Sequence, residues 1–174
     1  MTLDHHHLIR LGGAAALLGG LLRFVSTFIS WVEASWSLEL LYLITDLCLL
    51  FGLIAIFLAR AGRLGIAGLI GFVASLSAQS AIVGPDHTPF GIDVYGTAVM
   101  VISLGIALLS IDIIRTRSYP LFIPALWISS PLVFIGYSMA GAASYGWGYT
   151  FGGILFSLGF VAAGVVLIRH PFFD

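Results

Sequence analysis

The sequence predicts an all-α integral membrane protein whose 174 residues form a bundle of six transmembrane helices. The first observation behind this prediction is composition: 60% of the residues are apolar, 9% are charged, and the mean hydropathy is +1.10. Soluble domains average about 25% charged residues. The second observation is that the apolar residues form six segments of roughly the 20 residues that a membrane-crossing helix needs. At this length we expect a single transmembrane domain, 1–174, without a separate soluble domain.

The first three expected spans cover approximately residues 8–31, 38–59 and 64–83. The first is longer than the ~7–15 apolar residues of a signal peptide and contains Arg23, so we interpret it as a retained helix. The second is rich in leucine and isoleucine and ends at Arg60. The third carries glycines at three-residue intervals, which allow a neighbouring helix to approach closely. Because the connections are short, we expect consecutive helices to be antiparallel.

The last three expected spans cover approximately residues 92–114, 119–140 and 147–168. The fourth follows a connection that contains two prolines and two glycines, which is typical of tight turns. In the fifth, Pro120 suits a helix start, whereas Pro124 and Pro131 remove backbone hydrogen bonds and predict a kink. The sixth begins with closely spaced glycines and ends at Arg169.

The charged residues predict one orientation in the membrane. Six of the seven arginines fall on one side of the six spans: Arg10, Arg60, Arg63, Arg115, Arg117 and Arg169. The opposite connections carry acidic residues and no arginine: Glu33, Glu39, Asp86 and Asp93. The positive-inside rule makes the arginine side cytoplasmic. We therefore expect a multi-pass protein of the cytoplasmic (inner) membrane with both termini in the cytoplasm.

Residues recur at fixed intervals along the chain. Three triplets are each separated by 53 and then 54 residues: Arg10, Arg63 and Arg117; Tyr42, Tyr95 and Tyr149; Gly52, Gly105 and Gly159. Such a period predicts three tandem helical hairpins, arranged as parallel repeats about an axis along the membrane normal. The alternative is that helix length and the charge rule alone impose similar spacing. That alternative explains the arginines better than the tyrosines and glycines.

Arg23 is an unusual residue because it lies inside an apolar span. It is eight residues before Trp31, which places it ~12 Å below the outer boundary at 1.5 Å per residue. Asp46 lies at a similar depth, ~13 Å, on the next helix, so we expect the two to form an ion pair. Ionisable residues inside a membrane are functional candidates by default. Two alternatives remain: a structural pair that fixes helix register, and a path for protons or ions.

The other polar side chains also gather in the predicted outer half. If they converge, they line a polar pocket around Arg23, with Asp46 as its orienting partner. The candidate ligand-binding residues are Arg23, Asp46, Glu39, Tyr42, Ser75, Gln79, Tyr95 and Tyr149.

Composition excludes several classes of chemistry. The chain has no lysine, so it cannot form a lysine Schiff base with retinal or pyridoxal phosphate. Its net charge of -1 argues against a nucleic-acid partner. Cys48 is the only cysteine, which rules out an intramolecular disulfide. We expect neither a cofactor nor a metal, and we interpret His5, His6 and His7 as part of a solvated chain end, since a metal site needs three or four converging ligands.

Three functions remain open at this level. The first is binding or transport of a small anionic or amphiphilic molecule in the outer-half pocket. The second is a non-catalytic accessory subunit of a larger membrane complex or a homo-oligomer, because the helices carry many small residues suited to helix contacts. The third is an intramembrane enzyme that acts on a lipid-soluble, isoprenoid-like substrate with Asp46, Glu39 or Asp93 as the general acid. Arg23 argues against Asp46 in that role because a nearby cation favours the ionised carboxylate.

Overall fold

The computed structural model describes residues 5–29, 35–83, 93–140 and 142–170, and every regular element in these ranges is an α-helix. The helices are α1 (His5–Ser26), α2 (Trp36–Leu58), α3 (Ile66–Ala81), α4 (Val94–Thr116), α5 (Phe122–Met139) and α6 (Ala142–Arg169). Five of them, all except α3, contain a stretch long and apolar enough to cross a membrane. The all-helical bundle is therefore confirmed, and its long apolar helices are those of a multi-pass membrane protein.

Helix α3 is shorter than the sequence predicts. We expected a span over 64–83, whereas α3 has 16 residues, with Gly65 as its N-cap and Ile82 as its C-cap. At 1.5 Å per residue it measures ~24 Å, less than the ~30 Å of a typical hydrocarbon core. It still exposes large apolar side chains, as a helix facing lipid would, with Ile66 at 78%. A complete crossing by α3 stays a prediction.

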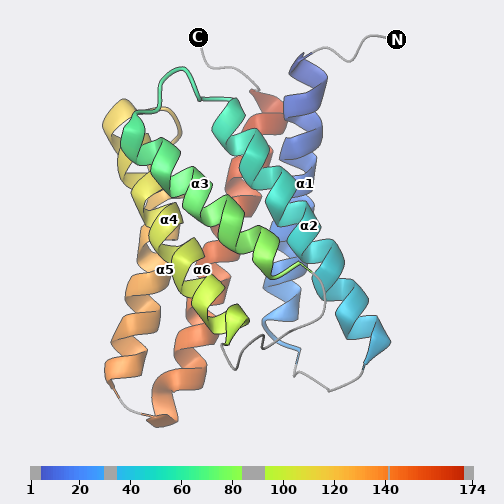
Figure 1. Ribbon diagram of the computed structural model, residues 1–174, viewed down its shortest axis with the longest axis vertical. Coiled ribbons are helices and arrows are strands. Elements are labelled where there is room, and N and C mark those ends of the chain that lie inside the picture. The colour runs from blue at the N-terminus through green and yellow to red at the C-terminus, as the bar shows by residue number, and fades with distance from the viewer. Residues whose placement is uncertain (1–4, 30–34, 84–92, 141, 171–174) are drawn as a thin grey trace.

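The helices are arranged as three antiparallel hairpins, α1–α2, α3–α4 and α5–α6, each with extensive contact between its two members. Between hairpins, α1 packs extensively on α6, whereas the contacts of α4 with α5 and of α2 with α3 are sparse. Helix α1 starts and α6 finishes at the same end of the bundle, at the top of Figure 1. The α2–α3 and α4–α5 connections lie there too, so we call it the arginine-rich end.

The repeated glycines occupy equivalent places in the three hairpins. A Cβ atom added to Gly52 would lie 2.7 Å from Cα of Ala16 on α1. A Cβ added to Gly105 would lie 2.7 Å from the carbonyl oxygen of Gly71 on α3, and one added to Gly159 would collide with the ring of Trp127 on α5. At each glycine the second helix of a hairpin lies directly against the first, which is the role of small residues in membrane helix packing.

Glycines also bring the first and last helices together. A Cβ on Gly20 would lie 2.8 Å from the carbonyl oxygen of Ser157, and one on Gly164 would lie 2.6 Å from the carbonyl oxygen of Gly13. Contact this close to backbone atoms leaves no room for a side chain at Gly20 and Gly164. Helices α1 and α6 therefore join the first hairpin to the third along their length.

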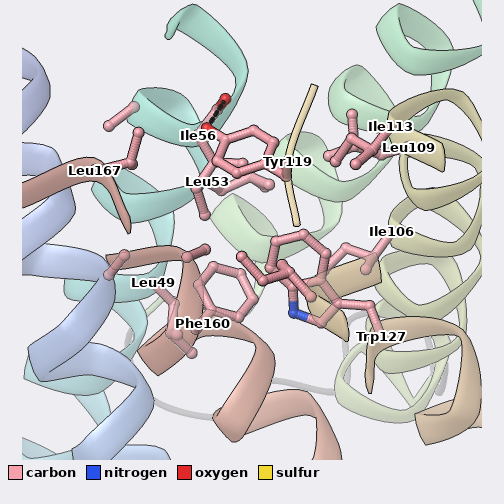
Figure 2. Close-up of a cluster of buried hydrophobic side chains, with 14 of the residues drawn as sticks. Leu49, Leu53, Ile56, Ile106, Leu109, Ile113, Tyr119, Trp127, Phe160 and Leu167 are labelled. Atoms are coloured by element: carbon pink, nitrogen blue, oxygen red, sulfur yellow. Dashed lines mark hydrogen bonds between the residues drawn. The ribbon is translucent and has the colours of Figure 1, made fainter. Parts of the chain in front are cut away.

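Large buried side chains fill the bundle towards the arginine-rich end. Figure 2 shows side chains from α2, α4, α5 and α6 meeting there. Trp127 is 1% exposed and packs edge-to-face on Phe160 with ring centroids 5.4 Å apart. Other members of this cluster are Leu49, Leu53, Ile56, Ile106, Leu109, Ile113, Tyr119 and Leu167, all buried. These side chains fill the centre of this half of the bundle.

Candidate functional site

A pocket of about 310 Å³ lies in the half of the bundle away from the arginine-rich end, and all six helices contribute to its wall. Its polar side chains are those of Arg23, Asp46, Gln79, Tyr95 and Tyr149, together with the hydroxyls of Ser103 and Ser130 from the middle of α4 and α5. Its apolar wall includes Leu49, Ile102, Phe134 and Phe156. Arg23, Gln79 and Tyr95 lie within one turn of their helix ends, so the cation lies at one end of the pocket, whose size is at the lower limit for ligand sites.

Arg23 lies in the last turn of α1, because the helix ends at Ser26 instead of continuing to residue 31. The hydroxyls of Ser26 and Thr27 donate to the Arg23 carbonyl at 2.9 and 2.8 Å, and the Thr27 N–H donates to the same oxygen at 3.1 Å. Arg23 is thus only three residues, ~4.5 Å along the axis, from the helix end, nearer the end than we expected. A cation there interacts favourably with the negative end of the helix dipole.

The side chains of Arg23 and Asp46 share the pocket and interact electrostatically. The direct ion pair that we expected between these two side chains stays a prediction. The guanidinium Nη2 of Arg23 donates to the Tyr95 hydroxyl at 3.2 Å, and Oδ1 of Asp46 accepts from Nε2 of Gln79 at 3.1 Å. The four side chains link α1, α2, α3 and α4, so Arg23 and Asp46 each bond to a helix outside their own hairpin.

Five of the eight candidate ligand-binding residues line the pocket: Arg23, Asp46, Gln79, Tyr95 and Tyr149. Tyr42 interacts electrostatically with Arg23, Asp46 and Tyr95. Tyr42 and Tyr95 of the first two hairpins therefore lie near Arg23, and Tyr149 of the third lines the same pocket.

Three candidates lie elsewhere: Ser75 and Glu39 from the eight ligand-binding candidates, and Asp93, which was a candidate general acid only. Ser75 is fully buried and its hydroxyl donates to the carbonyl oxygen of Gly71 at 2.8 Å, so it serves helix packing. Glu39 is exposed in the first turn of α2. Asp93 caps α4, where its carboxylate accepts the Gly96 N–H at 2.9 Å. As general acids, Glu39 and Asp93 would act away from this pocket.

Apart from Tyr149, the α5–α6 side of the pocket was missing from our candidates. Ser130 and Pro131 line it from α5, and Gly148, Gly152 and Gly153 line it from α6. The indication in the sequence was the cluster of glycines at the start of the sixth span, opposite a proline in the fifth. Small residues there leave space between two helices.

The arginine-rich end is held by hydrogen bonds between hairpins. Nε of Arg60 donates to the Ser118 carbonyl at 2.8 Å, and its guanidinium lies 5.0 Å from the centre of the Tyr119 ring. The Tyr119 hydroxyl donates to the carbonyl oxygen of Ile56 at 2.8 Å. These contacts join the α2–α3 connection to the α4–α5 connection on the far side of the core from the pocket.

Asp112 of α4 bonds the start of α3. The residue is 3% exposed, and its carboxylate accepts the N–H of Gly65. The reason is electrostatic: the first N–H groups of a helix lack partners inside the helix, and the helix dipole favours a negative charge beside them.

The described part of the chain contains no group of three or more His, Cys, Asp and Glu side chains suited to a metal ion. His5, His6 and His7 form the first turn of α1 with exposed side chains. His87 and Asp86 lie outside the described residues.

No family model matches the chain, and neither a curated protein nor a solved structure is significantly similar to it. The class that the fold supports is a helical bundle suited to crossing a membrane several times. The pocket is therefore the feature from which a function more specific than this class can be inferred.

Proposed function

We propose that this protein binds or transports a small amphiphilic molecule with an anionic head, held in the pocket around Arg23. The observation that carries the proposal is the position of Arg23: its guanidinium faces a pocket whose remaining wall is mainly apolar. A cation at one end of the pocket suits a carboxylate or phosphate-type head through charge-assisted hydrogen bonds. The apolar wall suits a hydrocarbon body.

The electrostatic surroundings favour a head of low charge. Arg23 is the only arginine or lysine among the residues that line the pocket, and Asp46 lies in the same pocket. A second negative charge on the ligand would lack a cation and would be repelled by Asp46. The Tyr95 hydroxyl, which already bonds Arg23, offers a neutral donor to the same head.

The packing of the other half favours binding over open conduction. Trp127, Phe160 and Ile106 are each at most 2% exposed, and they fill the bundle between the pocket and the arginine-rich end. An ion path would have to pass through this cluster. Transport would require the hairpins to move relative to one another, and the sparse α4–α5 and α2–α3 contacts are the places where such movement meets least resistance.

The test is ligand binding by the purified protein in lipid nanodiscs, with decanoate as the anionic probe and decyltrimethylammonium as the cationic control. We expect decanoate to bind and the cation not to bind. Replacing Arg23 by glutamine removes hydrogen bonds to a charged group and should weaken decanoate binding roughly 10- to 100-fold. The matched control is Arg115→Gln, an exposed arginine at the other end, which should bind like the wild type.

Two further outcomes decide the proposal. If Arg23→Gln does not fold, Arg23→Lys keeps the charge and should bind decanoate more weakly than the wild type, because lysine lacks the planar fork of donors. Equal binding by Arg23→Lys, Arg23→Gln and Arg115→Gln would contradict the proposal. Native mass spectrometry after gentle extraction adds an independent check: a bound mass of a few hundred daltons supports the proposal, whereas a protein-sized mass favours an accessory subunit.

We also propose that the arginine-rich end faces the cytoplasm, so that the pocket faces outward from the inner membrane. The support is the positive-inside rule applied to six arginines at one end. Gly62, exposed in the α2–α3 connection, is open enough for a cysteine. In a background with Cys48 replaced by serine, Gly62→Cys should react with an impermeant maleimide only after the cells are broken. Reaction in intact cells would reverse the assignment.

A further inference from the structure

We infer that the pocket opens sideways between α4 and α5, and that its ligand is a single-chain anionic lipid entering from the bilayer. The inference rests on the proposed function, since it takes Arg23 as the site of the anionic head. It adds the class of ligand and the route of entry. We call the opening, lined by Met100, Leu104 and Ile135, the lateral portal.

The portal residues belong to the pocket and to the surface at the same time. Met100 and Leu104 of α4 and Ile135 of α5 all line the pocket. They are also 62%, 68% and 52% exposed. A side chain can satisfy both conditions only at an opening, so the pocket reaches the outer face of the bundle between these two helices.

The contact between α4 and α5 is closed in one half and open in the other. In the half towards the arginine-rich end, Ile106 and Ile113 of α4 and Ile123 and Trp127 of α5 are at most 2% exposed. The pocket takes its α4 residues from 95–104 and its α5 residues from 130–135, which lie beyond that closed half. The two helices therefore separate towards the end that holds Arg23, in agreement with their sparse contact overall.

On its α5 side the portal is bordered by residues that are hydrogen-bonded to α6 or packed against it. The Ser130 hydroxyl donates to the carbonyl oxygen of Gly152 at 2.8 Å, which ties α5 to α6 beside the portal. The next residue, Pro131, lines the pocket and has no backbone N–H to offer. The rings of Phe134 and Tyr149 stack edge-to-face at 4.7 Å across the same two helices. The wall presented to a ligand chain here is apolar apart from the tyrosine hydroxyl.

The position of the head fits a lipid in a membrane leaflet. Arg23 is in the last turn of α1 and Tyr95 is in the first turn of α4, so their hydrogen bond lies close to the helix ends, where lipid headgroups are found. From Tyr95 to Leu104 the helix rises ~13.5 Å. A hydrocarbon chain attached to a head at Arg23 can therefore run along α4 and leave through the portal without moving its head out of the interfacial layer.

The test compares a water-soluble and a membrane-resident carboxylate, hexanoate and hexadecanoate, in nanodiscs. Ile135→Trp places a large ring in the portal, and the matched control is Leu132→Trp, which is 61% exposed on the same helix but does not line the pocket. We expect Ile135→Trp to weaken hexadecanoate binding roughly tenfold, by overpacking the space for the chain. Hexanoate, whose short chain does not reach the portal, should bind as in the wild type.

The outcomes separate the portal from the proposed function. If both carboxylates bind the wild type and lose affinity in Arg23→Gln, but Ile135→Trp behaves like Leu132→Trp, the lateral portal is wrong and the pocket stands. If neither carboxylate binds the wild type, both proposals fail. A second measurement applies should Ile135→Trp not fold: a hexadecanoate carrying a diazirine in mid-chain should label Met100 or Leu104 on irradiation. Labelling spread evenly over lipid-facing residues would overturn the portal.

Discussion

The contact between Gly52 of α2 and Ala16 of α1 supplies a quantitative test of how the hairpins are held together. In Gly52→Ala the new Cβ would lie 2.7 Å from Cα, 2.8 Å from Cβ and 3.0 Å from N of Ala16. The shortest of these is 0.7 Å inside the 3.4 Å at which ordinary contact begins. These atoms belong to a helix backbone and cannot rotate away, so the two helices must separate by a similar amount along this contact.

Such a separation has a predictable energetic cost. A gap of 0.5–1 Å removes roughly a quarter to a half of the dispersion energy of the contacts it opens, and overpacking typically costs about 1–3 kcal/mol. We expect Gly52→Ala to lower the free energy of unfolding by about 2 kcal/mol. The assay is titration of the protein in mixed micelles with sodium dodecyl sulfate, followed by near-ultraviolet circular dichroism. Helices persist in the detergent-unfolded state. The difference in free energy of unfolding between Gly52→Ala and the wild type therefore reports helix packing more than helix propensity.

The matched control is Gly136→Ala. Gly136 lies inside α5 with nothing within 4 Å of an added Cβ, so this variant should be as stable as the wild type or slightly more stable. If Gly52→Ala and Gly136→Ala unfold at the same detergent fraction, α1 and α2 do not pack as closely as described. The reasoning applied to the repeated glycines would then be refuted.

Three further predictions concern the arginine-rich end and use the same unfolding assay. Tyr119→Phe should lower the free energy of unfolding by about 1–3 kcal/mol, because it removes the hydroxyl that donates to the carbonyl oxygen of Ile56, a buried residue near the end of α2; an unchanged value would mean that another donor replaces this hydroxyl. Asp112→Ala should cost about 1 kcal/mol by removing the carboxylate that accepts the Gly65 N–H, and an equal stability would contradict that role. Arg117 has φ of 51° in the left-handed region, so Arg117→Gly should stabilise the protein by up to about 1 kcal/mol, whereas a loss would show that its side chain matters more than its backbone.

The number, order and pairing direction of the helices could be predicted because long apolar segments and short connections leave few alternatives. The gathering of Arg23, Asp46 and Gln79 could also be anticipated from depth along neighbouring helices. The length of α1 could not be predicted: the apolar segment continues to residue 31, whereas α1 ends at Ser26. Hydroxyl residues occur both inside helices and at helix ends, so Ser26 and Thr27 do not mark the terminus in the sequence.

The hydrogen-bond partners of the charged side chains could not be predicted from the sequence either. Arg23 bonds Tyr95, 72 residues away, and no local pattern indicates that α1 and α4 meet across the pocket. Asp112 bonds a backbone N–H of Gly65, a donor that nearly every residue carries and that leaves no mark in the sequence. Composition predicts how many polar groups in a membrane bundle need hydrogen-bond partners. Helix packing decides which residues provide those partners.

The close packing of α1 on α6 has a consequence for the order of folding. Gly20 and Gly164 bring together two helices that are far apart in the chain, so α1 must wait until α6 has been synthesised before it finds its main partner outside its own hairpin. Closing so large a loop is slow relative to forming local hairpins. Each hairpin can assemble as it emerges from the ribosome, and the joining of α1 to α6 is then the final step. Bulky substitutions at these two glycines should delay maturation and expose the chain to quality-control proteases before they alter the pocket.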